Sequence, residues 1–419
     1  MITYNKVPLK DVCKIISGYA FKSESFKVGG NTPVIKIKNI KIGTASLDDA
    51  DYVDSIFLDK IDDKYKVTAD DVLISLTGSH MTQPNSVVGR VGRYPSKYPV
   101  ALLNQRAGKV IPNEARIDKS YLFYSLLGED IRKEIAQMAH GAASQANVSP
   151  TQVESIEIPL PELKSQKKIG SVLQNYDNLI ENNNRRIDIL EDMAQSLYRE
   201  WFVNFRYPSH EDSLDADGKP KLIDSPLGQI PEGWEVKPLG DLVEFKRITI
   251  KKGSVPDNTP YMGLEHFPRK SIALSDWEEV SEIGSNKLAF NRGDILFGKI
   301  RPNFHKVGVA QVDGLCSSDT FVLSPKEPEH HSLIAMVTFS NEFVAQAVQT
   351  AQGSKMPRAS WDVLKEFAVC LPDSNALERF NSVVNPAIEQ IRLLSLKNRN
   401  LKQQRDMLLP KLISGQIKL

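Results

Sequence analysis

This chain of 419 residues has few cysteines, little net charge and no long apolar run. Cys13, Cys316 and Cys370 lie far apart and lack the spacing of zinc ligands or of a disulfide framework. The net charge of +1 does not by itself indicate a nucleic-acid partner. No run reaches the length of a membrane span, and the N-terminus lacks an apolar signal region. We therefore expect a soluble cytoplasmic protein with no membrane partner.

What the chain does contain is one unit present twice. Its length suits two or three domains, and a repeat of this period is too long for a solenoid, whose units run about 20–50 residues. The sequence therefore predicts two domains of one fold, related by a pseudo-twofold internal repeat. The matching segments are residues 7–12 with 237–242, 70–74 with 292–296, and 153–161 with 364–372.

Each copy is predicted to be a mixed α/β domain, in residues 1–162 and 234–372. In the first copy, residues 33–40, 72–76 and 87–91 have the patterns of strands. Residues 121–138 have helical spacing, and Gly141 is expected to follow the end of that helix. Residues 207–233 are rich in proline and glycine, which indicates a linker. The predicted fold class is α+β.

A long helix with an apolar heptad seam is predicted after each domain, in residues 163–206 and 373–419. Asn183 is the polar residue of the first seam, whereas Asn398 and Arg405 interrupt the second. We expect the two helices to pair, either side by side or antiparallel; the alternative is that each packs only on its own domain. The seam positions are Ile180, Asn183, Ile187, Leu190, Leu197, Ile391, Leu394, Leu401 and Leu408.

Basic loop regions recur at equivalent places in the two copies, within residues 72–116 and 286–311. Their side chains combine cations, which suit phosphate, with amides, which can read base edges. The recurrence favours DNA binding over a solvated basic face without a partner. The candidate contacts are Gln83, Asn85, Arg90 and Arg93 in the first copy, and Lys299, Arg301, Asn303, His305, Lys306, Lys355 and Arg358 in the second.

No complete catalytic pattern is present. Residues 293–299 imitate a phosphate-binding loop, but Ile300 stands where Ser or Thr must hold magnesium. Residues 385–388 only approach the Asn-Pro-Pro-aromatic motif of amino-methyltransferases, and 162–164 match only the end of a common nuclease pattern. The histidines form no His-x-x-x-His pair. These features predict a non-catalytic reader without a metal or cofactor of its own.

Four segments, in order, carry a family resemblance. Residues 141–161 followed by 165–169, then 196–205, 227–240 and 408–417, resemble the landmark segments of type I restriction–modification specificity (S) subunits. The match spans nearly the whole chain. One departure is residues 372–379, which lack the glutamine found at the start of the first long helix. That difference bears on local capping or partner contacts.

The resemblance implies two target-recognition domains that each read one half of a bipartite site in double-stranded DNA. It implies that the long helices form an antiparallel coiled coil, which sets the distance between the half-sites. It also implies docking of two modification (methyltransferase) subunits and joining of restriction (nuclease/translocase) subunits. S-adenosylmethionine, ATP and Mg²⁺ would then bind to those partners. The alternatives are a heptad scaffold that joins two proteins without DNA and, less favoured, a fused methylase–nuclease.

Overall fold

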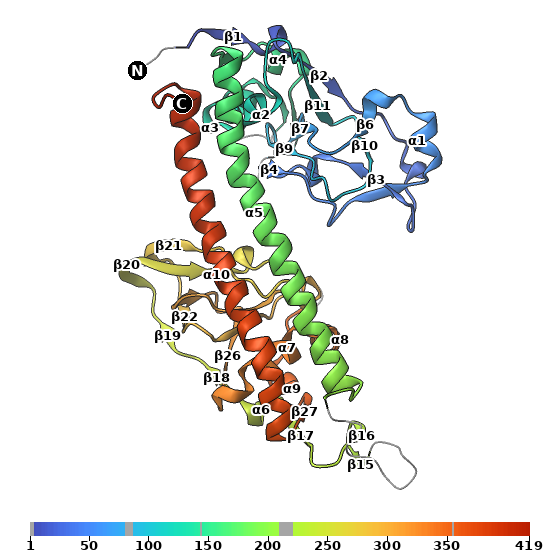
Figure 1. The fold of residues 1–419 in the computed structure, drawn as a ribbon, viewed down its shortest axis with the longest axis vertical. Coiled ribbons are helices and arrows are strands. Elements are labelled where there is room, and N and C mark those ends of the chain that lie inside the picture. Colours follow the sequence, from blue (N-terminus) through green and yellow to red (C-terminus); the bar gives the residue numbers. More distant parts are fainter. Residues whose placement is uncertain (1–3, 80–86, 143–144, 209–220, 354–355) are drawn as a thin grey trace. The chain divides into compact units, whose positions relative to one another are not determined.

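The computed structural model describes residues 4–79, 87–142, 145–208, 221–353 and 356–419. Its contacts divide the chain into two compact units. Unit 1 comprises residues 1–178 and 403–419, and unit 2 comprises residues 179–402. Each long helix therefore contributes residues to both units. Figure 1 shows the two long helices, α5 (Leu163–Tyr198) and α10 (Ser374–Ile413), together with the strands of each copy.

Unit 1 contains a five-stranded sheet of order β2-β11-β7-β9-β4 and a four-stranded sheet of order β5-β3-β10-β6. β1 pairs with β14, and β12, β13 and β8 form a further small sheet. Helices α2 and α3 pack beside these sheets, and Asp118 caps α2 by accepting a hydrogen bond from the Tyr121 amide at 2.9 Å. The strands are β1 Lys6–Pro8, β2 Cys13–Ser17, β3 Thr32–Ile35, β4 Gly43–Thr44, β5 Asp51–Val53, β6 Lys66–Val67, β7 Val72–Ser75, β8 Thr77–Gly78, β9 Val91–Arg93, β10 Ala101–Leu103, β11 Ala107–Pro112, β12 His140–Ala142, β13 Gln145–Asn147 and β14 Glu157–Pro159, and the helices are α1 Ile56–Lys60, α2 Lys119–Leu127, α3 Glu129–Met138 and α4 Pro150–Glu154.

Several predicted boundaries in the first copy were wrong. The strand expected over 33–40 ends at Ile35, because the Asn39 side chain accepts the Lys36 amide at 3.0 Å and turns the chain into a 3-10 helix. The strand expected over 87–91 begins only at Val91. The helix expected over 121–138 is two helices that meet at Gly128, and residues 140–142 form β12 instead of a helix end.

Unit 2 repeats this topology. Its strand order β18-β26-β23-β24 matches the order β2-β11-β7-β9 of unit 1. The order β21-β20-β25-β22 matches β5-β3-β10-β6. The parallel pair of β20 and β25 corresponds to that of β3 and β10. β15 and β16 form a hairpin inside the predicted linker. The strands are β15 Leu222–Ser225, β16 Gly228–Pro231, β17 Glu235–Pro238, β18 Val243–Lys246, β19 Thr249–Ile250, β20 Gly253–Met262, β21 Glu278–Ile283, β22 Lys287–Phe290, β23 Ile295–Gly298, β24 Val307–Val309, β25 Gly314–Cys316, β26 Thr320–Pro325 and β27 Ala368–Leu371, and the helices are α6 Leu239–Leu242, α7 His331–Phe339, α8 Asn341–Gln349 and α9 Trp361–Leu364.

The repeated sequence motif before β7 and β23 is a structural turn. Asp71 and Asp294 each accept a hydrogen bond from the amide three residues earlier, at 2.8 Å in both copies. Asp70 and Gly293, which precede them, both have positive φ, of 64° and 89°. Asp294 is buried and receives a further bond from the Lys246 ammonium at 2.8 Å. The internal repeat predicted from the sequence is thereby confirmed down to individual hydrogen bonds.

The long helices are α5, Leu163–Tyr198, which continues as a π-helical turn over Arg199–Val203, and α10, Ser374–Ile413. In unit 1 an Arg405 guanidinium nitrogen lies 2.5 Å from an Asp177 carboxylate oxygen. In unit 2 the Asn183 amide donates to the Asn398 side-chain oxygen at 2.8 Å. Further along in unit 2, the rings of Trp201 and Phe380 lie 5.9 Å apart. Because the residue number falls along the second helix as it rises along the first within this unit, the pair is antiparallel.

The antiparallel arrangement covers each domain with parts of both helices. In unit 2, Ala194 of α5 and Trp201 of the π-helical turn share one core with Phe380 and Val384 of α10 and with Leu333 of the globular domain. In unit 1, the start of α5 and the end of α10 pack together on the first domain, through Ile169, Leu173 and Leu412. The seams therefore bury against both the partner helix and a domain. Among the described helices, none has the length and apolar run that a bilayer crossing requires.

Candidate nucleic-acid interface

The basic loop of the second copy has a constrained backbone. The 3-10 helix Pro302–Phe304 is flanked by Arg301 and His305, at φ of 49° and 50°. Residues other than glycine rarely adopt this left-handed backbone conformation, which costs of order 1–3 kcal/mol per residue. The Arg301 amide donates to the Pro357 carbonyl at 2.8 Å, and the His305 amide donates to Pro302 at 2.8 Å. The surrounding chain therefore holds the loop in a defined shape.

Arg301 and Asn303 are the exposed polar side chains of this loop. The half-buried ring of Phe304 lies close to two arginines, with its centroid 6.0 Å from the Arg301 guanidinium and 4.2 Å from that of Arg269. Lys270 follows Arg269 and is also exposed. Sequence reasoning missed these two cations, although their adjacency in the segment Pro268-Arg269-Lys270 is a visible basic pair.

Two other predicted contacts share one carboxylate. The Lys299 ammonium lies 3.7 Å from an Asp319 oxygen, and the Arg358 Nε lies 3.5 Å from the same oxygen. Lys299 also donates to the Ser318 carbonyl at 2.6 Å. The Arg358 side chain is exposed, and its backbone pairs with Gln352. Asp319 reduces the local positive charge, so these cations present a weaker field than their number indicates.

His305 is the predicted contact whose placement disagrees with a base-reading role. It is only 6% exposed, and its Nε2 lies 2.9 Å from the Phe339 carbonyl oxygen. Burial lowers its pKa below the usual range, against the effect of that hydrogen bond. The Lys306 ammonium is also turned inward, toward the Leu264 carbonyl, and burial lowers its pKa. In this structure both side chains anchor the loop, because the core and backbone carbonyls satisfy them.

In the first copy, Gln83 and Asn85 lie outside the described residues, as Lys355 does in the second. Arg93 is half-buried, with its guanidinium 4.2 Å from the centroid of the Phe123 ring. Arg90 is half-buried as well, and burial together with Arg132 lowers the pKa of its guanidinium. The structure therefore places both arginines on the first domain with their side chains half-buried.

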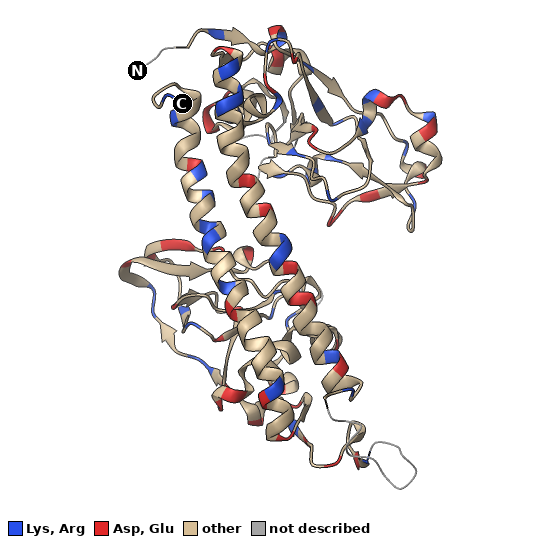
Figure 2. Cartoon of the chain, in the orientation of Figure 1, with Lys and Arg blue, Asp and Glu red and all other residues tan. Residues whose placement is uncertain are grey.

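Other basic residues of the first region hold the fold. The Lys109 ammonium donates to the Lys66 carbonyl at 2.7 Å, and Arg116 donates to the Asp11 carbonyl at 2.9 Å. Figure 2 shows lysine and arginine interspersed with aspartate and glutamate along both long helices. The exposed helix faces are thus of mixed charge, which suits contacts with proteins more than continuous contact with phosphate.

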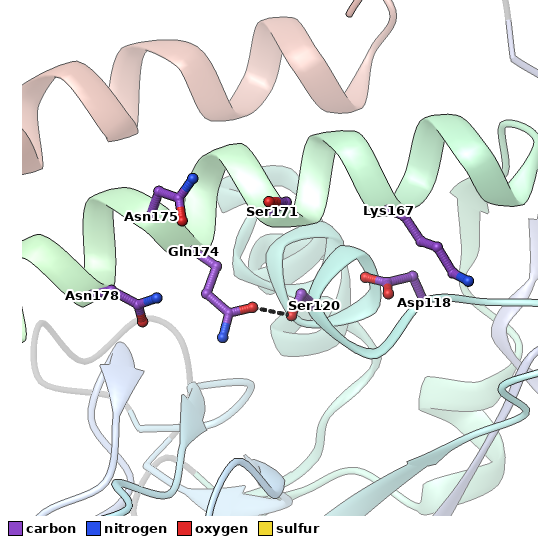
Figure 3. Close-up of a pocket in the computed structure, with 7 residues that line it drawn as sticks. All are labelled: Asp118, Ser120, Lys167, Ser171, Gln174, Asn175 and Asn178. Carbon is purple, nitrogen blue, oxygen red and sulfur yellow. Dashed lines mark hydrogen bonds between the residues drawn. The ribbon is translucent and has the colours of Figure 1, made fainter.

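A polar pocket of about 220 Å³ lies between α2 and the start of α5 in unit 1 (Figure 3). Within it the Ser120 hydroxyl donates to the Gln174 side chain at 2.6 Å. No nucleophile–base arrangement is formed by the side chains that line it. The lining residues are Asp118, Ser120, Lys167, Ser171, Gln174, Asn175 and Asn178.

The glutamine that the second copy lacks has a definite role in the first. Gln166 accepts the Asp118 amide at 2.8 Å and donates to the Arg116 and Pro161 carbonyls at 3.2 and 2.8 Å. It thereby fastens α5 to the first domain. In the second copy Asp373 caps α10, by accepting the Ala376 amide at 2.9 Å. Asp373 thus caps its own helix, whereas Gln166 fastens α5 to the neighbouring domain.

Within the described ranges, no group of three or more His, Cys, Asp or Glu side chains is placed to hold a metal ion. The segment that imitates a phosphate-binding loop contains β23, an inner strand of its sheet. All three cysteines are buried and unpaired. Burial raises the pKa of each thiol to about 12, so none is poised as a nucleophile.

These observations define a duplicated two-domain protein built on an antiparallel helix pair. The family model for the type I restriction modification DNA specificity domain matches residues 1–192 and 231–403, and the chain therefore belongs to that family.

Relatives and a solved structure agree with this membership. The MjaIX type I restriction enzyme specificity subunit of Methanocaldococcus jannaschii is 25% identical over 334 residues, covering 75% of this chain and 73% of the relative. The EcoDI specificity subunit of Escherichia coli is 24% identical over 273 residues, covering 61% and 59%. The crystal structure of a type I S subunit from M. genitalium has the same fold, with a TM-score of 0.58 at 14% identity over 98% of this chain and 96% of that one.

Proposed function

We propose that this chain is the sequence-specific DNA-binding subunit of a type I restriction–modification complex, and that each domain reads one half of a bipartite site. The observation that carries this proposal is the duplication itself. Two copies of one strand topology are mounted on the same antiparallel helix pair, and the sequence places a basic loop region in each copy. A split DNA sequence is the kind of ligand that two equivalent readers suit.

The chemistry of the second loop supports direct reading of bases. Arg301 and Asn303 are exposed on a backbone held by Pro357 and Pro302. Arginine can bind guanine and asparagine can bind adenine through paired hydrogen bonds in the major groove. Arg269, Lys270 and Arg358 are further exposed cations of the same unit, and their charge suits phosphate. We assign the reading of one half-site to Arg301 and Asn303, and that of the other to the region of Gln83, Asn85, Arg90 and Arg93.

We further propose that the chain itself is non-catalytic and docks two modification subunits, with restriction subunits joining the assembly in the cytoplasm. S-adenosylmethionine, ATP and Mg²⁺ would bind to those partners. The mixed-charge faces of α5 and α10 are suited to protein docking. Methylation, cleavage or ATP hydrolysis by the purified chain without partners would contradict this assignment.

The deciding experiment is the methylated motif of the assembled complex in cells that express parent or variant chains. Arg301→Ala or Asn303→Ala should relax one half of the motif and leave the other intact, because a paired base contact contributes about 1–3 kcal/mol of discrimination. Lys252→Ala, at an exposed lysine of the same unit, is the matched control and should change neither half. Equal change in both halves would refute the modular assignment. Absence of salt-dependent DNA binding by the complex would favour the protein scaffold instead.

A further inference from the structure

A buried carboxylate on α5 is bonded to the segment beside the basic loop of unit 2. Glu191 is only 6% exposed, and one of its oxygens, Oε1, accepts both the Ser271 hydroxyl at 2.7 Å and the Ile272 amide at 2.8 Å. Glutamate is rarely this buried unless its oxygens are satisfied. A leucine of similar size would fill the space but would leave both donors unsatisfied.

The segment that Glu191 holds is bonded on its other side to the loop. The Lys270 amide donates to the His305 carbonyl at 3.0 Å, and the Val309 amide donates to the Ile272 carbonyl at 3.1 Å. Ala273 and Val309 form a parallel bridge, and the Arg269 guanidinium lies over the Phe304 ring. Residues 269–273 are thus clamped between α5 and the chain that carries Arg301 and Asn303.

We propose that Glu191 is a positioning residue for DNA reading, which fixes the loop of the second domain against the paired helices. The inference rests on the proposed function, since it takes the loop at 301–306 to be the reader. Recognition of a base edge requires the reading side chains to be held within about half an ångström. Glu191 supplies this by tying the segment next to the loop to the helix that also packs against α10.

The bonding pattern allows the contact to persist when Glu191 is protonated. Both hydrogen bonds reach Oε1, so a proton can reside on Oε2 without breaking either. Burial raises the pKa of Glu191 to about 7, with the Ser271 hydroxyl and the Ile272 and Ala273 amides opposing the rise and Asp188 adding to it. Arg269 and Lys270 are the cations of the attached segment. A glutamine at this position keeps the same acceptor, whereas a leucine removes it.

The test uses the complex with its modification subunits and DNA duplexes that carry the parent motif or one changed base in either half-site. The ratio of methylation rates between matched and changed duplexes measures discrimination. Glu191→Leu should lower discrimination about tenfold, equivalent to about 1.4 kcal/mol, at the half-site that Arg301→Ala affects and not at the other. Glu191→Gln should stay within about twofold of the parent. Asp192→Leu, at the exposed neighbour, is the matched control and should have no effect.

Equal behaviour of Glu191→Leu and Asp192→Leu, or an equal loss at both half-sites, would overturn the positioning role. If the Glu191→Leu chain does not assemble with the modification subunits, the Ser271→Ala variant tests the positioning role instead. It removes one hydrogen-bond donor to Glu191 without burying a new group. It should lower discrimination at the same half-site by a few-fold, and parental behaviour would again overturn the role. An effect of Arg301→Ala without any effect of these variants would reject the positioning role alone. No half-site effect of Arg301→Ala would reject the proposed function.

Discussion

Asn183 and Asn398 meet inside the helix pair, where the Asn183 amide donates to the Asn398 side-chain oxygen at 2.8 Å. Both side chains are buried, and the Asn398 amide donates in turn to Asn184 at 2.8 Å. A slip of either helix by one turn would place each amide against apolar side chains. The two polar residues therefore lock the register of α5 against α10.

We expect Asn183→Leu to destabilise the protein by about 1–3 kcal/mol, because it leaves the buried side-chain oxygen of Asn398 without its donor. The double variant Asn183→Leu with Asn398→Leu should recover most of that loss, since both partners are then apolar. Asn184→Ala, which removes only the second hydrogen bond, is the control. Chemical unfolding measures all three, and a double variant less stable than the sum of the singles would contradict the pairing.

The assignment of the inward-facing side of each long helix can be tested by introducing a charged side chain there. Leu190→Asp and Leu401→Asp should each lower thermal stability, since an unpaired carboxylate in an apolar contact is strongly unfavourable. Ile189→Asp is the matched control, because the Ile189 side chain is 58% exposed and adjacent to Leu190. Each globular domain should keep its fold. Equal melting temperatures for Leu190→Asp and Ile189→Asp would show that the assigned face is wrong.

Burial of Glu191 predicts a pH-dependent stability. Its pKa in the folded protein is raised to about 7 from 4.5. The fold therefore favours the protonated carboxyl, and parental stability should fall as pH rises from about 4.5 to about 7. Glutamine does not titrate, so the advantage of Glu191→Gln over the parent should grow by about 2–3 kcal/mol between pH 5 and pH 8. Asp192→Asn is the exposed control. A difference in unfolding free energy that stays constant with pH would contradict the burial.

Helix length is expected to set the gap in the DNA motif. The register from Asn183 and Asn398 places Leu190 opposite Ile391 and Leu401 opposite Ile180, so Leu190 and Leu401 do not face each other, although both belong to the predicted seams. Matched insertions belong after Asn178 and after Lys402, where both helices cross the unit boundary. One heptad in each adds about 10.5 Å, or roughly three base pairs. The methylated motif should show a longer gap or lost activity, and an unchanged gap with full activity would exclude the ruler.

Much of the architecture could be predicted from the sequence, because it depends on periodic patterns. The repeat, the two long helices and the family membership all rest on features visible along the chain, and each is confirmed. Element boundaries were less predictable. Gly128 divides a stretch that periodicity alone reads as one helix, and the Asn39 side chain ends a strand early. Each of these boundaries depends on a single residue, which a pattern of apolar positions does not take into account.

The candidate site, too, could be predicted only in part from the sequence. Its loop could be located from composition, and Arg301 and Asn303 remain predicted contacts on an exposed, constrained backbone. The inward orientation of His305 could not be foreseen, because its partner, the Phe339 carbonyl, comes from another element. Arg269 and Lys270 join the same surface only through the pairing of their segment with residues 305–309.

The sequence by itself determined that this protein has two similar domains, that each is followed by a long helix, and to which family the chain belongs. Only the tertiary structure decided which partners satisfy the polar residues that interrupt the second seam. Asn398 and Arg405 interrupt an apolar heptad, yet Asn398 pairs with Asn183 and Arg405 with Asp177. The physical reason is that a polar group is costly in a seam only until a partner satisfies it. Those partners lie more than 200 residues away in the chain, where folding alone brings them together.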